Sequence, residues 1–560
     1  MRSAMTRELG ARLGYYDLFG KRAEWDDLSK RVRKFRTKTI FDILGRIGVA
    51  LNEGKYNDPE IQVALVKGFF GNSGVWERGQ EFMRLSHLEA HSQVLFDDLQ
   101  LLALAKIAVL ETDDRHPDRG TMSDLGEALL MASDYTALDR SEPEYIAFVA
   151  GRFHPGHVLL NAIARAYDLY LSGNEALRGT RHFVDFRAII EAKFELPIDK
   201  LLGLLILLVA PWLLRDLSSV ATQTTLIDLK RYLPRRRFSR REIAAVFAFV
   251  GTDINSLRKD VRAEYSRERL RPYHFVPFAR APLVRFGDVV ACPSIKLLAD
   301  RLSEGWHHLL LTHFAHEKRA EDFFRFMGDV FENYIDRLLV RMHPVLGPAK
   351  YIGPAALEEE LPESAKCDAI LQEGDTLVLF ESKTAQFRLE AISAESLALY
   401  KARLRKVIVE KGALQLNATI EAIKQGMLAP LGIDARQIRR FRPTVVTLDT
   451  SPMGPERYRD LHREVASRGL LSAEDIAPME ILTVADMETL ELHSSLGGGS
   501  IATALARKER SALLREESMR TFLGASGSPA VGTTAKNVYL SGVFDKIEAL
   551  ARAAAAPVTS

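Results

Sequence analysis

Apolar residues recur at helical spacing through most of the first 221 residues. In the run at 95–110, leucine, isoleucine, valine and alanine return every three or four positions, and strand-like alternation is hard to find in this part of the chain. Turn-forming residues interrupt the pattern at 113–120 and 154–156. The pattern predicts a large, mainly helical region, whose limits we set at residues 1–224.

Residues 225–315 have the pattern of a connecting domain made of helices and a hairpin. Ser239 and Glu242 stand three positions apart ahead of an apolar run, which is the arrangement of a capping box and predicts the start of a helix. Further along, residues 275–293 predict a short strand, a Gly-Asp turn and a second strand.

Strand-like and helical patterns alternate from residue 316 to 492. We expect a helix at 321–340, a strand–turn–strand segment at 367–383, a helix at 410–427, strands at 443–448 and 479–484, and a helix at 485–492. Strands interleaved with helices predict an α/β domain with a central mixed sheet. A glycine-rich joint at 496–500 then leads through a helical C-terminal extension, residues 493–560, whose alanine-rich end we expect to be a flexible tail.

Composition narrows the class of protein only a little. Hydrophobic residues make up 47% and charged residues 27%, which is typical of a globular protein. A net charge of +2 neither favours nor opposes binding to nucleic acid, because charges of one sign can still gather in patches. Two cysteines, far apart in the sequence, exclude a disulfide framework and a cysteine-rich zinc site and favour the cytoplasm.

One apolar run, residues 201–214, has to be weighed as a membrane segment. It contains a proline and is shorter than the roughly 20 residues that span a bilayer. We therefore interpret it as a buried core helix and expect no membrane association.

The segment 366–383 contains the strongest candidates for catalytic residues. We expect strands at 367–371 and 376–383 with a tight turn between them. With the turn centred between residues 373 and 374, Asp368 would lie opposite Leu379, and Asp368, Glu381 and Lys383 would share one face of the hairpin. A one-residue change of register would separate them.

Burying these three charged side chains together costs folding free energy unless they bind a cation. The second strand is apolar on both faces and should be buried, where unpaired charges are unfavourable. Two neighbouring carboxylates repel each other unless a cation lies between them, and hard oxygen ligands suit Mg²⁺ or Mn²⁺. A lysine beside them can orient an attacking water and stabilise charge on a phosphate. These are the residue types that metal-assisted phosphodiester hydrolysis requires.

Asp368 followed by Glu381-Ser382-Lys383 resembles the D…E-x-K signature of the PD-(D/E)XK nucleases, the restriction-endonuclease-like superfamily. Residues 326–334 resemble the first core helix of that family, with Glu332 as its acid. The resemblance covers residues 323–490 and implies a restriction-endonuclease-like domain at 316–492. Cys367 stands where the signature has proline, a position that varies widely in the superfamily.

The resemblance also implies roles for individual residues. Asp368, Glu381, the backbone carbonyl of Ser382 and Glu332 would hold Mg²⁺ or Mn²⁺, and Lys383 would serve the attacking water. Residues 411–416 resemble a helix from which some members of the family assist the site. Lys411 and Gln415 share a face of that helix, a pattern that a solvated helix face explains equally well.

Alternatives remain open at this stage. Glu381 and Lys383 also fit a structural ion pair on an edge strand. DNA is the preferred substrate because it is the commonest one in the resembled superfamily, and nothing in the residues excludes RNA. A free-standing bacterial nuclease would suit defence against phage. The rival interpretation is a non-catalytic nucleic-acid-binding or scaffold protein, and a homodimer or higher oligomer, or an activator bound to the helical region, fits either.

Two basic runs and one histidine cluster are weaker signals. Residues 30–38 and 230–241 interleave arginine with aromatic residues, as nucleic-acid contacts do. The denser second run supplies our candidate contacts: Lys230, Arg231, Arg235, Arg236, Arg237, Arg240 and Arg241. His313 and His316 lack a third zinc ligand and are better explained as polar positions on a helix. No Walker-type phosphate loop occurs, which argues against an ATP-driven motor.

Overall fold

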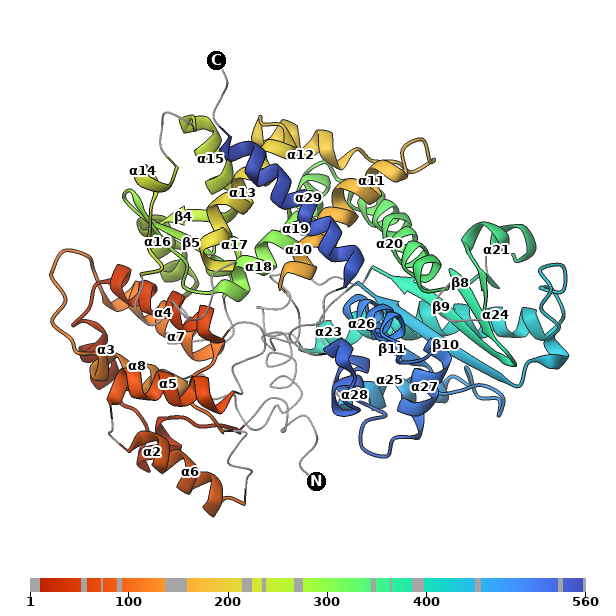
Figure 1. Cartoon of the computed structure of the whole chain (residues 1–560), viewed down its shortest axis with the longest axis horizontal. Helices are drawn as coiled ribbons and strands as arrows, with labels where there is room; N and C mark the ends of the chain where they lie inside the picture. The colour runs from red at the N-terminus through yellow and green to blue at the C-terminus, as the bar shows by residue number, and fades with distance from the viewer. Residues whose placement is uncertain are drawn as a thin grey trace.

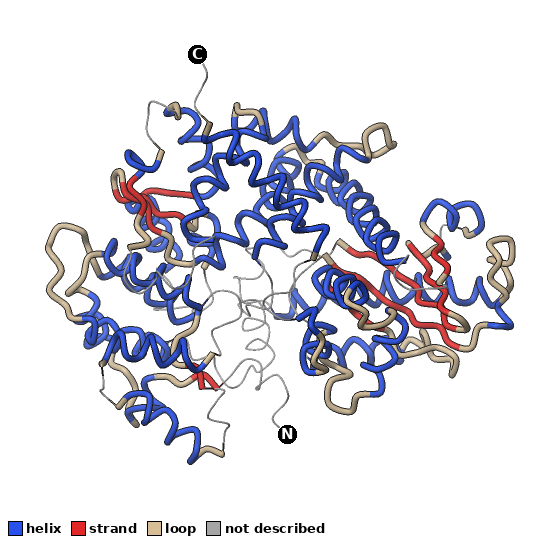
Figure 2. Tube along the Cα trace, viewed as in Figure 1, coloured by secondary structure: helices blue, strands red, loops and turns tan. Residues whose placement is uncertain are grey.

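Helices fill most of this structure, and its strands gather in a few places (Figure 2). It is a computed structural model of the 560-residue chain. The residues that it describes are 11–51, 58–71, 74–87, 93–135, 159–213, 224–233, 238–265, 275–343, 349–362, 365–384, 397–448, 455–531 and 537–556.

The N-terminal region is helical, as the apolar spacing predicts. Two very short parallel strands pair within it. Its elements are β1 (Ala11–Arg12), α2 (Tyr15–Phe19), α3 (Trp25–Val32), α4 (Thr37–Leu51), α5 (Pro59–Phe70), α6 (Val75–Leu85), β2 (Gln93–Val94), α7 (Asp98–Glu111), α8 (Met122–Tyr135), α10 (Leu159–Tyr167), the π-helix η3 (Asp168–Ser172), α11 (Gly173–Ala176), α12 (Phe186–Phe194) and α13 (Ile198–Leu213).

The connecting residues form a small sheet among helices, with strand order β3-β6-β5-β4 in the described residues. The capping box at Ser239 and Glu242 is present and opens α15. A short helix, α17, occupies the first part of the segment where we expected a strand, and the Gly-Asp turn joins β5 to β6. The elements are β3 (Ile227–Asp228), α14 (Leu229–Tyr232), α15 (Arg240–Val250), β4 (Gly251–Asp253), α16 (Ile254–Tyr265), α17 (Val276–Arg280), β5 (Leu283–Phe286), β6 (Val289–Ala291), α18 (Ile295–Ser303) and α19 (Gly305–His316).

The next part is an α/β domain around a mixed sheet, with order β11-β10-β9-β8-β7 among the described strands. β7, β8 and β9 pair antiparallel, whereas β9, β10 and β11 pair parallel. The elements are α20 (Ala320–Met342), β7 (Lys350–Ile352), α21 (Pro354–Glu360), β8 (Ala369–Glu373), β9 (Thr376–Lys383), α23 (Leu397–Leu404), the π-helix η7 (Arg405–Ala413), α24 (Leu414–Lys424), the 3-10 turn η8 (Ala435–Gln437), β10 (Arg440–Thr447), α25 (Pro455–Ser467), β11 (Glu480–Thr483) and α26 (Val484–Ser495).

The last part of the chain returns to both halves of the molecule. It comprises α27 (Ile501–Arg510), α28 (Met519–Ala525), the 3-10 turn η9 (Pro529–Val531) and α29 (Val538–Ala555). α27 and α28 lie beside the sheet domain, whereas α29 packs against α10 and α13 of the helical region (Figure 1). The alanine-rich end is helical to Ala555, where Leu550, Ala551 and Ala554 pack against the core, and the last four residues lie outside the described residues.

Two apolar cores run through the chain and cross the limits that we set from the sequence. On β9, Val378 and Phe380 belong to the core shared with α20 and α26, and Leu377 and Leu379 belong to the core shared with η7 and α24. The sheet is therefore covered on both faces, which buries β9 as its apolar pattern predicts.

The apolar run in α13 is buried in the first of these cores, as we interpreted it. No single helix in the described ranges has the length and apolar character to cross a membrane, and α12 with α13 meets that test only as a pair bent by 68°.

A buried ion pair fixes the extension to the sheet domain. Lys508 of α27 donates to both carboxylate oxygens of Glu480 on β11, at 2.9 and 3.1 Å, and to the backbone carbonyl of Arg515 at 2.9 Å. The Lys508 side chain is 0% exposed and that of Glu480 is 11% exposed. Removing one partner of such a pair leaves the other charge buried and unpaired.

We expect Lys508→Met to destabilise the protein by about 3–5 kcal/mol, and the double variant Lys508→Met/Glu480→Leu to recover most of that loss. Urea unfolding followed by circular dichroism measures both. Lys424→Met is the matched control, because its pair with Asp475 is partly exposed and should contribute little. A double variant no more stable than Lys508→Met would contradict the account.

Candidate active site

The hairpin of β8 and β9 brings the two acids of the D…E-x-K pattern close enough to interact. Its register pairs Ala369 with Phe380, and the Asp368 amide donates to the Phe380 carbonyl at 3.0 Å. Leu379 pairs with Ile370, so Asp368 does not lie opposite Leu379 as we expected. The turn is Gly374-Asp375, with Gly374 at φ 61°, so the true register differs from the expected one by two residues. Asp368 comes directly before β8, and its carboxylate still reaches β9, where the Ser382 amide donates to it.

Glu381 is the most constrained of these residues. It is 0% exposed on β9, and its Oε2 is buried with no hydrogen-bond partner, while Lys383 Nζ donates to its Oε1. Burial and the nearby Asp368 carboxylate raise the pKa of Glu381 well above its ordinary value. The ion pair of the alternative interpretation is therefore present, but it lies on a central strand and not on an edge.

Asp368 is held by the strand beside it. The Ser382 amide donates to its Oδ2 at 2.5 Å, and burial raises its pKa against the opposing effect of Lys383. Carbonyls alternate along a strand: that of Phe380 faces β8, and that of Lys383 accepts from Leu448 beyond β10. The Ser382 carbonyl accordingly points toward the Asp368 side of β9.

Glu332 joins this group from another element, α20. Burial, Asp368 and Asp329 raise its pKa to about 8. Glu332 also acts on Glu381, whose pKa it raises further, and on Lys383, whose charge it favours. Sequence reasoning placed Glu332 here from the resemblance alone, and the structure brings it into electrostatic contact with all three hairpin residues.

Lys383 is the cation of the cluster. Burial by itself would lower its pKa, but the carboxylates of Glu381 and Asp368 outweigh burial and raise it. The Gln415 side-chain oxygen accepts from Lys383 Nζ at 3.4 Å, and the Gln415 amide donates to the Lys366 carbonyl, two residues before Asp368. Gln415 thus connects the lysine to the start of β8.

The path of the helix that carries Gln415 depends on a glycine. Gly412 packs on β10 so closely that a Cβ there would lie 2.9 Å from Val445 Cγ2. The π-helical stretch η7 and α24 follow one another without a break, and wide π turns recur at functional sites. The Lys411 side chain is exposed, and it makes no hydrogen bond or ion pair with another described residue.

The donor set fits a hard divalent cation. Asp368, Glu381 and Glu332 supply carboxylate oxygens, and the buried Glu381 Oε2 lacks the partner that such an atom needs. No three His, Cys, Asp or Glu side chains in the described residues lie in an arrangement ready to hold a metal ion. In this arrangement the Lys383 ammonium neutralises Glu381, so a metal would have to share or replace that contact.

Two neighbours were not anticipated from the sequence. Asp329 lies one turn before Glu332 on α20 and raises its pKa, and Lys366 lowers the pKa of both Glu332 and Asp368. The signal for Asp329 was its spacing of three from Glu332 on the predicted helix. For Lys366 the sequence gives no signal beyond its position two residues before Asp368.

The dense basic run lies apart from this cluster. α14 and α15, which carry its described residues, are at the far side of the molecule from β9 (Figure 1). Lys230 pairs with Asp288 at 2.5 Å and Arg241 with Glu195 at 2.8 Å, whereas Arg231 and Arg240 are exposed and pair with no described residue. Arg235, Arg236 and Arg237 lie outside the described residues.

The other weak signals have structural explanations. In the run at 30–38, Arg31 pairs with Glu127, Arg33 with Glu111 and Lys34 with Asp124. Those acids belong to α7 and α8, so this run holds helices together.

The histidine cluster lies on α19. His313 lies 3.4 Å from Glu317, and no zinc-like group appears among the described side chains.

No protein-family model, curated protein or solved structure matches this chain. The chemistry of the site therefore rests on its geometry.

We expect Glu332→Gln to raise the melting temperature in chelator by a few degrees at pH 7–8 and by little at pH 5. The folded protein keeps the Glu332 proton up to about pH 8, whereas the unfolded chain loses it near the ordinary value of 4.5. Stability therefore falls as pH rises through this window, by at most about 1.4 kcal/mol per unit, and glutamine removes the loss.

Thermal unfolding of both proteins across pH 5–8 makes the comparison. Glu321→Gln, an exposed position on the same helix, is the control and should change nothing. A Glu332→Gln variant no more stable than the wild type at pH 8 would show that the acids do not strain the fold.

Proposed function

We propose that this chain is a divalent-metal-dependent nuclease of the PD-(D/E)XK, restriction-endonuclease-like type, which hydrolyses phosphodiester bonds in nucleic acid. The observation that carries the proposal is the convergence of Asp368, Glu381 and Glu332 with Lys383 at the end of a central strand. A mixed sheet covered by helices on both faces is compatible with that fold.

The residues divide into those that hold the metal and those that handle the phosphate. Asp368, Glu381, the Ser382 carbonyl and Glu332 would hold Mg²⁺ or Mn²⁺, which polarises a phosphate and lowers the pKa of bound water. The raised pKa of Lys383 keeps it protonated at neutral pH. Lys383 therefore acts as a cation that orients water and offsets phosphate charge, and Gln415 holds it in place.

DNA is the proposed substrate, on the strength of the resembled superfamily, and defence against phage is the proposed role. The rival is a non-catalytic nucleic-acid-binding or scaffold protein. The cluster favours the enzyme, because one buried and two partly buried acids beside one lysine lower stability unless a ligand binds them. If the role is defence, Asp368→Asn should abolish protection against phage.

We expect the wild type to cut plasmid DNA in Mg²⁺ or Mn²⁺ and not in chelator, and Asp368→Asn and Lys383→Met to lower the rate at least about a hundredfold. Plasmid, linear duplex, single-stranded DNA and single-stranded RNA are compared by gel, which separates DNA from RNA specificity. Asp375→Asn is the matched control, since Asp375 is exposed at the opposite end of the same hairpin.

Two outcomes would count against the proposal. A wild type that cuts none of these substrates in either metal would favour the scaffold. Cleavage that persists in both site variants would place the active site elsewhere.

The basic run is proposed to bind substrate and not to catalyse. We expect Arg231→Ala/Arg240→Ala to weaken DNA binding and to flatten its salt dependence, with a slope reduced by about 0.9 for each phosphate that the variant no longer neutralises, and with turnover at saturating DNA unchanged. Arg178→Ala/Arg436→Ala, which removes two exposed arginines paired with local acids, is the control. Equal salt slopes for the two double variants would remove this run from the substrate path.

A further inference from the structure

The helix that carries Glu332 has a second polar face. Tyr334, Arg337 and Arg341 follow one another at spacings of three and four, so they line one side of α20. Tyr334 is two residues from Glu332, which is about 200° around a helix. The acid and the tyrosine therefore point in nearly opposite directions.

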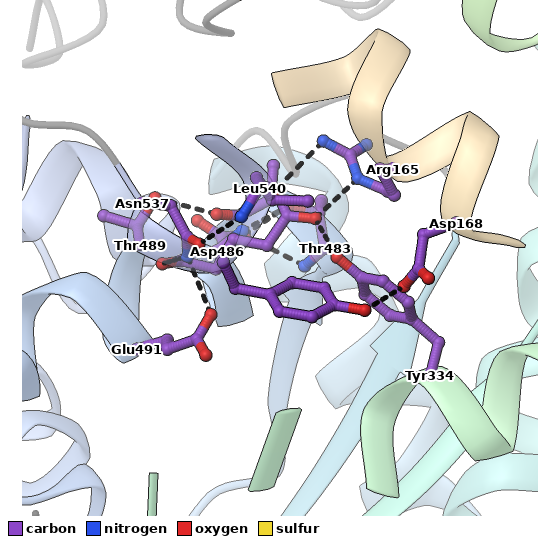
Figure 3. Close-up of polar contacts among 12 residues, drawn as sticks. Arg165, Asp168, Tyr334, Thr483, Asp486, Thr489, Glu491, Asn537 and Leu540 are labelled. Carbon is purple, nitrogen blue, oxygen red and sulfur yellow. Dashed lines mark hydrogen bonds and ion pairs between the residues drawn. The ribbon is translucent and has the colours of Figure 1, made fainter. Parts of the chain in front are cut away.

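Tyr334 ends on a buried ion pair. Its hydroxyl donates to Glu488 Oε1 at 2.7 Å, and Arg165 donates to the same carboxylate at 2.6 and 3.0 Å. The side chains of Arg165 and Glu488 are only 7% and 6% exposed. Arg165 belongs to α10 of the helical region and Glu488 to α26 of the sheet domain (Figure 3).

Arg337 adds a second contact with the helical region. It donates to both oxygens of Asp168 on η3, at 3.0 and 3.3 Å, and Tyr539 of α29 donates to the same aspartate at 2.9 Å.

Arg341 closes the row on this face of α20. It donates to Glu491 at 2.6 Å, and Asn537, the N-cap of α29, donates to that carboxylate at 2.7 Å. α20 is thus hydrogen-bonded along one side to η3, α26 and α29, and Glu488 of α26 links it to Arg165 of α10.

Stability alone does not explain this network. A buried ion pair recovers little more than the cost of removing its charges from water, and apolar residues of similar size often replace one without loss. Charges with directional partners do fix the rotation and the register of the helix that carries them. Rotating α20 by one residue would break the bonds of Tyr334, Arg337 and Arg341 together and carry Glu332 away from Asp368.

We infer that Tyr334, held by Glu488 and Arg165, is a positioning residue that aims Glu332 at Asp368 and Glu381. The inference rests on the proposed nuclease function. It also links the helical region to the site, because Arg165 and Asp168, which hold this face of α20 in place, come from that region.

Tyr334→Phe tests it, since phenylalanine keeps the packing and removes only the hydroxyl. We expect single-turnover cleavage at saturating DNA to slow by about tenfold to a hundredfold, with a higher manganese concentration for half-activation and unchanged affinity for DNA. Tyr458→Phe is the matched control. It removes another buried hydroxyl of the same domain, bonded to the Met479 carbonyl at 3.2 Å, and its rate should stay within about twofold of the wild type.

A double-mutant cycle separates positioning from general loosening. In a Glu332→Ala background, Tyr334→Phe should have no further effect on the rate, because the residue that it positions is gone. An unchanged effect in that background, or a Tyr334→Phe variant that behaves like Tyr458→Phe, would overturn the inference and leave the nuclease intact. A wild type that neither cleaves nor binds manganese would overturn the proposed function itself, and this inference with it.

Discussion

A buried carboxylate at the end of a central strand is the interaction on which the rest of this structure depends. Glu381 has no exposure and one oxygen without a partner, and the carboxylate of a second acid, Asp368, lies close enough to raise its pKa. Two acids so placed cannot both ionise unless positive charge is near. Lys383 supplies part of that charge, while burial and the neighbouring carboxylates keep the pKa values of Glu381 and Glu332 raised. The arrangement costs folding free energy in the absence of a ligand, which is the usual condition of a functional site.

The sequence predicts the local elements better than it predicts their partners. The limits of β9 and the capping box at Ser239 follow from apolar spacing and local hydrogen bonding, which act over a few residues. The expected hairpin register is wrong by two residues because the turn is centred between Gly374 and Asp375, one position later than we placed it. The position of such a turn depends on which residue takes a positive φ, and here that residue is Gly374. The contact of α29 with α10 and α13 could not be predicted either, because an apolar face predicts that a helix is buried but does not say against which surface.

The candidate site could be found from the sequence because its three hairpin residues lie within 16 positions of one another, on two strands joined by a tight turn. Its surroundings could not. Lys366 has no signature of its own, and its effect on Glu332 appears only when α20 packs against the sheet. Asp329 has only its spacing of three from Glu332 on the same helix. The same limit applies to the basic run at 30–38: its acidic partners lie 78 to 96 residues away in the chain, so the run resembles a free cationic surface until the helices pack.

The two polar faces of α20 connect these observations. One face directs Glu332 into a cluster that is electrostatically unfavourable on its own, so α20 would relieve the repulsion by turning or sliding away from the sheet. The other face is bonded to Glu488, Asp168 and Glu491, whose own partners come from α10 and α29. Directional bonds on the far side oppose the movement that repulsion on the near side favours. The helical region therefore helps to fix the position of α20, because two of the residues that restrain this helix, Arg165 and Asp168, belong to that region.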